Sequence, residues 1–203
     1  MSIKEKVKAM IAEKERGSIL FLQDFMELGD AVGVRAALCS LVAEKELVRL
    51  ARGIYCRPQF LNEYGVALAF PSPETIAEAV ARKENIRIIP YGDQAACRLG
   101  LSTFRISDLK YLTDGAPRVL KLAGSRAVYF NHTSEVKIFA YKNRMMQDLA
   151  MALRALGAEY FEDEWKRRRI SALLRNVPDD EFRMDIVLPP AWVGKILTEL
   201  RDR

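Results

Sequence analysis

The order of helix and turn signals in the first 58 residues most strongly constrains the fold. Ser2 and Glu5 match the S-x-x-E capping box, in which the side chain of each residue accepts a hydrogen bond from the backbone amide of the other. Apolar residues then recur at helical spacing: Ile3, Val7, Met10 and Ile11. This pattern predicts a first helix that ends before Gly17, because glycine is a common helix terminator.

Two more helix signals follow a short extended run at residues 19–21. Residues 22–28 are predicted to form a short second helix that ends at Gly29, and Asp30 is a typical N-cap for a third. The apolar stripe of this third helix is expected to contain Val34, Leu38, Leu41 and Val42. Its opposite face carries mostly small side chains: Val32, Ala36, Cys39, Ser40 and Ala43.

Residues 47–50 and 54–56 predict two strands, joined by a tight turn in which Gly53 is free to take a positive φ. Helix, short strand, helix, helix and hairpin is the order of a winged helix-turn-helix. In that fold the third helix enters the major groove of DNA, and the hairpin, or wing, lies along the DNA backbone.

The third helix and the hairpin contain most of the residues expected to contact DNA. Arg35 lies near the start of the third helix, where recognition helices donate to base edges. Ala36 and Ser40 are also expected to face bases, with Ala36 against a thymine methyl group. Residues 47–58 contain three arginines and no acidic residue, which favours contacts to phosphates. The predicted phosphate contacts are Arg49, Arg52 and Arg57 in the hairpin, and Lys4 and Lys8 in the first helix.

An alternative interpretation of this module stays open. Small residues on a helix also form packing faces, hairpin arginines are often a solvated surface, and some winged helices bind proteins instead of DNA. DNA binding that is absent or insensitive to salt would favour such a protein-interaction module.

The remainder predicts a linker at residues 59–72 and a second domain at 73–203. Strands and helices alternate there without a regular βαβ rhythm, so the predicted class of the whole chain is α+β. The expected helices are 73–83, 92–99, 143–156 and 162–176, and a last one that starts at Pro190. The expected strands are 86–89, 110–113, 119–122, 127–130 and 184–188.

The composition favours a soluble cytoplasmic chain. It has 203 residues, half of them hydrophobic, but no apolar run of 18 residues, and the first residues are polar and charged. Its formal net charge of +5 permits an anionic partner without requiring one. The cysteines, Cys39, Cys56 and Cys97, lie far apart and form no C-x-x-C pair, so we expect reduced thiols and no structural zinc.

No catalytic, cofactor-binding or metal-binding residue is predicted, so we expect no enzyme. His132, the single histidine, has no evident nucleophile or orienting partner. Residues 124–125 resemble the Gly-Ser pair that opens nucleotidyltransferase sites, but 126–133 contain none of the carboxylates that such sites need for metals. A hairpin turn is therefore predicted. The acidic clusters 162–164 and 179–181 are expected at helix starts. An enzyme with a catalytic site in the second domain is a further hypothesis, beside the DNA-binding protein and the protein-interaction module. No sequence motif supports it.

Residues 166–169, Lys-Arg-Arg-Arg, form the densest basic run. On a helix these side chains point around much of the circumference, so they predict a solvated helix end. A second contact with DNA, or with an acidic partner surface, is the alternative.

Several short motifs resemble antitoxins of the AbiEi type, which belong to type IV toxin–antitoxin systems. The N-terminal domain of that family is matched by Arg35-x-x-Leu38-x-x-Leu41, then Leu47-x-Arg49-x-x-Arg52-Gly53-Ile54-Tyr55. Later matches are Ser72-Pro73-Glu74, Ala95-Ala96-x-x-Leu99-Gly100-Leu101-Ser102 and Tyr111-Leu112-Thr113-Asp114-Gly115. The resemblance reaches from the N-terminus to about residue 157, with no comparable match for residues 158–203.

The resemblance implies a regulator with two partners. Its winged domain would bind double-stranded DNA at the promoter of its own operon and repress it, and dimerisation on an inverted repeat is compatible with this role. Its second domain would neutralise a neighbouring toxin that resembles a nucleotidyltransferase. Some relatives act without a toxin, so a stand-alone regulator is the alternative. The resemblance implies no cofactor and no membrane partner.

Overall fold

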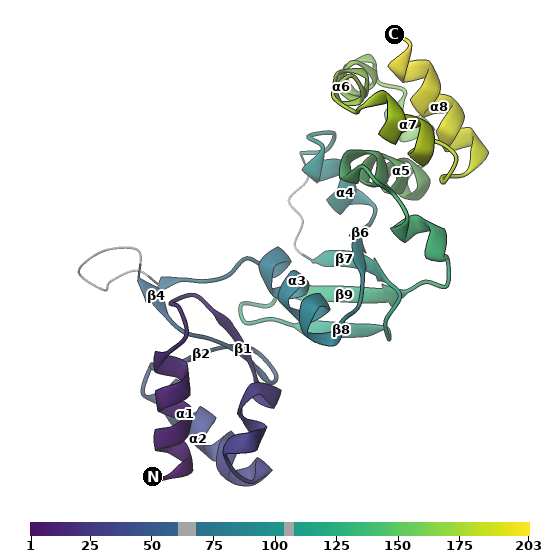
Figure 1. Cartoon of the computed structure of the whole chain (residues 1–203). Coiled ribbons are helices and arrows are strands. Elements are labelled where there is room, and N and C mark those ends of the chain that lie inside the picture. Colours follow the sequence, from purple (N-terminus) through teal and green to yellow (C-terminus); the bar gives the residue numbers. More distant parts are fainter. Residues whose placement is uncertain (61–67, 104–107) are drawn as a thin grey trace. The chain divides into compact units, whose positions relative to one another are not determined.

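The structure is a computed structural model in which the chain divides into two compact units (Figure 1). It describes residues 1–60, 68–103 and 108–203. The first unit contains Met1–Lys83 and Leu120–Ala127, and the second contains Glu84–Val119 and Val128–Arg203. The predicted scheme, with boundaries at residues 58 and 72, divides the chain differently. Because compact units and domains need not coincide, that scheme stays a prediction.

The first unit begins with the predicted order of helices and strands. Its elements are α1 (Ile3–Ala12), β1 (Ile19–Phe21), the 3₁₀ helix η1 (Leu22–Leu28), α2 (Ala31–Ala43), β2 (Val48–Ala51) and β3 (Ile54–Cys56). The capping box is present, because Ser2 accepts from the Glu5 amide and donates its own amide to the Glu5 carboxylate. The three strands are antiparallel in the order β1-β3-β2, and Gly53 takes a φ of 74° in the turn of the wing.

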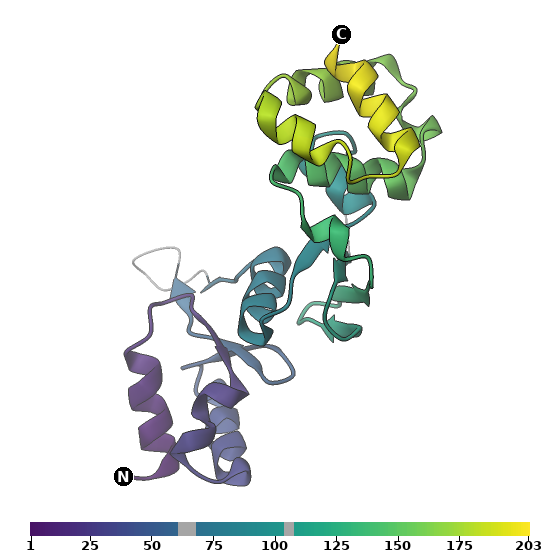
Figure 2. The ribbon, with the colours of Figure 1, turned by 45° about the vertical axis from the view of Figure 1, so that its right-hand side comes forward.

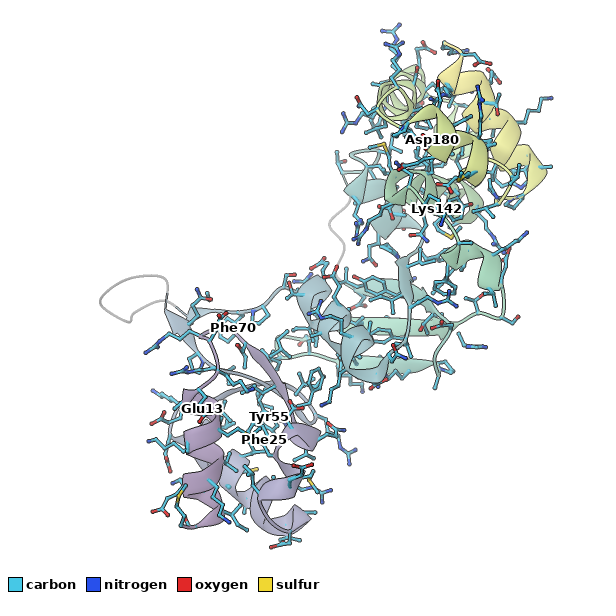
Figure 3. The ribbon with its side chains drawn as sticks, in the orientation of Figure 1. Glu13, Phe25, Tyr55, Phe70, Lys142 and Asp180 are labelled. Carbon is cyan, nitrogen blue, oxygen red and sulfur yellow. The ribbon has the colours of Figure 1, made fainter. Side chains whose placement is uncertain are left out.

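The core of this module lies between the helices and the small sheet. Val34, Leu38 and Leu41 of α2 are buried as the stripe predicted, and Val42 is half-buried. The residues they pack with include Val7 and Ile11 of α1, Phe25 of η1 and Tyr55 of β3. Figure 3 shows Phe25 and Tyr55 close together inside this module. The outer face of α2 is therefore left to the small and polar side chains.

Asp30 is expected to make the winged module more stable at neutral than at acidic pH. Its carboxylate accepts the amides of Gly33 and Val32 at 2.9 and 3.0 Å, and these bonds lower the pKa of Asp30 below its ordinary value of about 3.9. A carboxylate whose folded pKa is depressed stabilises the fold above the unfolded pKa. That contribution is lost as the pH falls through the folded pKa.

The measurement compares melting temperatures of the wild type and Asp30→Asn from about pH 7, well above the ordinary pKa of aspartate, to about pH 3, below it. Asparagine still caps the helix but does not titrate in this range. We expect the advantage of the wild type to shrink as the pH falls below about 4. A difference between the two proteins that stays constant over the range would contradict this role.

The predicted linker contains regular structure. Gln59–Phe60 (β4) pairs with Leu68–Ala69 (β5) in an antiparallel ribbon, so the two ends of this segment are joined by backbone hydrogen bonds. Both strands are only two residues long, and backbone pairing at this length needs no strand motif in the sequence. The rest of the predicted linker, up to residue 67, lies outside the described residues.

The helix predicted at 73–83 is present as α3 (Pro73–Glu84), and it completes the first unit. Ser72 accepts the Thr75 amide at 3.1 Å at its start. Near its end, Lys83 forms an ion pair with Asp24 of η1 and lies over the Phe21 ring. These contacts join α3 to the winged module.

The second sheet is mixed, as an α+β class requires. Its strands are β6 (Ile88–Pro90), β7 (Leu109–Thr113), β8 (Arg118–Lys121) and β9 (Ala127–His132), in the order β6-β7-β9-β8. β6 and β7 are antiparallel, whereas β7 and β9 are parallel. Leu109, Tyr111, Val128 and Phe130 alternate with more exposed residues, so one face of the sheet is buried. The α+β prediction is confirmed.

Helices dominate the rest of the second unit. They are α4 (Asp93–Arg98), η2 (Val136–Phe139), α5 (Arg144–Leu156), η3 (Glu159–Phe161), α6 (Glu164–Leu174), α7 (Asp179–Asp185) and α8 (Ala191–Arg201). Figures 1 and 2 show α6, α7 and α8 together on one side of α5. The core includes Met146, Leu149 and Leu153 of α5 and Leu197 and Leu200 of α8. α5 is central to this core because most of its residues are buried.

The strand predicted at 184–188 is wrong. Met184 and Asp185 belong to α7, whose first turn holds the acidic cluster 179–181 at a helix start, as expected. Asp185 is 0 % exposed and accepts the amides of Lys142 and Asn143, each at 2.8 Å. Figure 3 shows Lys142 below Asp180 of α7, just before α5 begins. Contacts from a distant part of the chain therefore hold this segment as a helix.

Candidate DNA-binding interface

The outer face of α2 is narrow and accessible within its module. Arg35, Ala36, Cys39 and Ala43 are exposed, and Val32 in the first turn is 75 % exposed. Arg35 forms no hydrogen bond or ion pair with any described residue. Because its neighbours on this face are small, the helix backbone has room to approach the floor of a groove closely.

Tyr55 of β3 is a buried polar side chain of the winged module. The side chain is 6 % exposed, and burial is the main cause that raises the pKa of its hydroxyl. The cations of Arg49 and Arg35 oppose this increase, and Cys39 adds to it. Arg49 lies directly opposite Tyr55 in the register of β2 and β3.

The wing places its other arginine at the turn. Arg49 is exposed on β2, and its Nε donates to the Ala51 carbonyl at 3.4 Å, which directs it along the strand toward the turn. Arg52 is exposed in the turn and has no hydrogen bond or ion pair in the described part of the chain. The two cations are available for phosphate oxygens, which are the first groups that a wing meets on DNA.

Ser40, Lys4 and Lys8 lie in a different, acid-paired environment. Ser40 is half-buried and donates to Glu44 at 2.9 Å, and Lys4 forms an ion pair with the same carboxylate at 2.5 Å. Lys8 pairs with Glu46 at 2.8 Å, and the hydrogen bond from this carboxylate raises the pKa of Lys8. The acids at the end of α2 thus partly neutralise the lysines of α1. Exposed pairs are weak, so these predicted DNA contacts stay predictions.

Arg57 has a structural role that the sequence did not reveal. Its Nη1 donates to the carbonyl oxygens of Ala12, at 3.0 Å, and Lys14, at the C-terminal end of α1. The last carbonyls of a helix lack partners within it, and a guanidinium there also complements the helix dipole. The predicted contact of Arg57 with phosphate stays a prediction.

Val32 is a further candidate contact on the outer face of α2, beyond the residues predicted to face bases. Its high exposure in the first turn of α2 places a branched apolar side chain where a thymine methyl group would fit. The available signal was its helical spacing to Ala36, four residues later.

Comparisons with known proteins identify a family. Residues 3–182 match the sequence profile described as a family of unknown function, DUF6088. The chain belongs to the DUF6088 family. Its structure is similar to the crystal structure of the Rv2827c protein from Mycobacterium tuberculosis, with a TM-score of 0.53 and 15 % identity. The match covers 98 % of this chain and 76 % of that one, and it supports the α+β fold alone. No curated protein matches the chain.

Neither the family description nor the similar structure gives an activity, so the antitoxin role that the AbiEi resemblance implies stays a prediction. None of the helices in the described segments combines the length and the apolar character that a bilayer crossing requires.

The basic run 166–169 of this DUF6088 chain is engaged within the second unit. Lys166 is only 9 % exposed, lies over the Tyr160 ring and pairs with Asp163. The remaining pairs are Arg167 with Glu199, Arg168 with Glu164, and Arg169 with the Leu99 carbonyl. A wholly solvated helix end is therefore wrong for Lys166, whereas its three neighbours are held by contacts within the protein.

The described parts of the chain offer few other candidates for catalytic or metal-binding groups. No group of three or more histidine, cysteine, aspartate or glutamate side chains there is arranged to hold a metal ion. The Nδ1 atom of His132 lies 2.9 Å from the Gly115 carbonyl. Gly124 and Ser125 both have positive φ and form the predicted hairpin turn.

Proposed function

We propose that this chain is a transcriptional repressor that binds the promoter of its own operon and acts as an AbiEi-like antitoxin. The observation that carries the DNA-binding part is the exposed outer face of α2, where Arg35 lies among small side chains, together with the exposed arginines Arg49 and Arg52 of the wing. In this proposal the chain acts by binding, needs no cofactor and is not an enzyme.

The chemistry of this face suits direct readout of bases. An arginine in the first half of a recognition helix donates two hydrogen bonds to the O6 and N7 atoms of guanine. Val32 and Ala36 offer apolar surface to thymine methyl groups on the same face. Arg49 and Arg52 contact phosphates and so set the register of the helix in the groove.

The decisive experiment is a binding titration of the purified chain with its own upstream DNA. Fluorescence anisotropy at several salt concentrations, with a scrambled duplex of equal length, separates specific from non-specific affinity. We expect tighter binding to the upstream region, and a stoichiometry of two chains on an inverted repeat. Absent or salt-insensitive binding would instead favour a protein-interaction module.

Replacing Arg52 with alanine is expected to weaken binding to all duplexes by a similar factor. The slope of log K against log salt should fall by about 1, because one phosphate contact is lost. Discrimination between the upstream and scrambled duplexes should be unchanged, since the turn of the wing reads no base. An unchanged slope would remove Arg52 from the interface.

The antitoxin part of the proposal rests on the AbiEi resemblance and on exposed apolar side chains in the second unit. These side chains are Trp165, Met184, Val187 and Trp192. Exposed aromatic and methionine side chains are enriched where proteins bind one another. We infer that the partner is a nucleotidyltransferase-like toxin encoded next to this chain.

Co-expression with the adjoining gene tests this part separately from DNA binding. Rescue of growth by the wild type and by Arg35→Ala/Arg52→Ala, but not by Trp165→Ala/Trp192→Ala, would support neutralisation through the second unit. Circular dichroism checks that the tryptophan variant is folded. If the neighbouring product is harmless, or if the wild type gives no rescue, a stand-alone regulator is the better description.

A further inference from the structure

The turn between β8 and β9 lies beside the wing. Residues Leu120–Ala127 belong to the first compact unit, although the two strands that they connect are part of the second sheet. The Ala123 amide donates to the Leu50 carbonyl at 3.0 Å. Leu50 is in β2, which is the edge strand of the winged sheet. A second hairpin therefore reaches the outer edge of the wing and pairs with its backbone there.

The turn of this second hairpin, residues 121–126 (the β8–β9 tip), has the composition of a phosphate-binding loop. Lys121, Ser125 and Arg126 are exposed, and residues 115–134 contain no aspartate or glutamate. Lys121 forms no hydrogen bond or ion pair with the described residues, whereas Arg126 has an interaction partner within the protein. The tip thus adds positive charge with no acidic residue of its own to neutralise it.

The local backbone keeps the tip narrow. The Leu122 amide donates to the Arg126 carbonyl at 2.9 Å and closes the turn. Gly124 and Ser125 take φ values of 83° and 62°, the left-handed conformation that tight hairpin turns require. A Cβ atom at Gly124 would meet no other atom within 4 Å, so the φ value and not packing accounts for glycine there.

We propose that the β8–β9 tip is a second phosphate-contacting element, which extends the wing on the far side of β2. Leu50 lies between Arg49 and Ala51 on that strand, so its hydrogen bond to Ala123 places the tip next to the backbone that holds Arg49 and Arg52. Lys121 is the main contact, and Arg126 and the Ser125 hydroxyl support it. The inference rests on the proposed DNA-binding function.

The test compares salt-dependent DNA binding of the full chain with that of Lys121→Ala/Arg126→Ala. Loss of two phosphate contacts should lower the slope of log K against log salt by about 1.8. With equal affinities of the two proteins at about 1 M salt, this slope corresponds to about 30-fold weaker binding of the upstream and scrambled duplexes alike at about 0.15 M salt. Arg183→Ala/Lys195→Ala removes the same charge from exposed positions in the second unit, and it should leave both quantities unchanged.

Because Arg126 has a partner within the protein, the single variant Lys121→Ala is measured as well, with thermal melting as a check of folding. It should lower the slope by about 0.9 and leave the melting temperature unchanged. A wild-type slope in both tip variants, together with a reduced slope in Arg52→Ala, would overturn the role of the tip and leave the proposed function standing. A wild type that does not bind DNA would overturn both.

Discussion

Replacing Arg35 with alanine is expected to reduce the preference for the upstream DNA over a scrambled duplex by about 10- to 100-fold. A bidentate arginine–guanine contact contributes about 1–3 kcal/mol of discrimination, and each 1.4 kcal/mol corresponds to about a tenfold change in affinity. Arg35 stands alone among small neighbours on the outer face of α2, so no other described cation of that face can replace it. The measurement is the ratio of the two dissociation constants at one salt concentration.

Two control variants separate base readout from charge. Arg35→Lys keeps the positive charge but lacks the planar fork, so it should retain non-specific affinity and lose most of the preference. Lys195→Ala removes one charge from an exposed position on α8 and should behave like the wild type. A preference in Arg35→Ala equal to that of the wild type would exclude Arg35 from the bases.

The second large effect is expected from Asp185→Ala, which should lower the free energy of unfolding by about 3–5 kcal/mol. The Asp185 carboxylate is fully buried and accepts the Lys142 and Asn143 amides. Without it, the Lys142 and Asn143 amides lose their charged acceptor, and each such hydrogen bond contributes about 1.5–3 kcal/mol. Asn143 also caps α5, so the central helix of the second unit loses support at its first turn.

Urea unfolding of Asp185→Ala and of Asp180→Ala measures this difference. Asp180 is exposed on the same helix, and its removal should change stability by no more than about 0.5 kcal/mol. Asp185→Asn keeps the shape of the side chain but exchanges one acceptor oxygen for a donor. Its stability should therefore lie between those of Asp185→Ala and the wild type. Equal midpoints for Asp185→Ala and the wild type would show that the buried carboxylate is dispensable.

The winged module was predictable because its signals are local. Ser2 with Glu5, Asp30 with the amides of Val32 and Gly33, and Gly53 in the turn of the wing each act within four residues. Caps, apolar spacing and turn residues therefore specify each element before any distant contact forms. The same locality explains why Arg35 and Arg52, which belong to a single helix and a single turn, were identified as exposed cations.

Roles that depend on distant partners were decided only by the tertiary structure. One such role is that of Arg57, which donates to carbonyl oxygens at the end of α1, more than forty residues earlier. Met184 and Asp185 were expected in a strand, but the amides before α5 hold Asp185 in a helix. A side chain's local pattern does not specify which distant polar group it will meet.

The sequence by itself determined the α+β class, the winged order of elements and the exposed outer face of α2, since these follow from backbone preferences and spacing along a few turns. The tertiary structure decided which cations stay available for a ligand and which complete the protein's own hydrogen bonds. It also brought the β8–β9 tip to the wing, because hydrogen bonds between residues far apart in the chain form only once the fold places their donors and acceptors together.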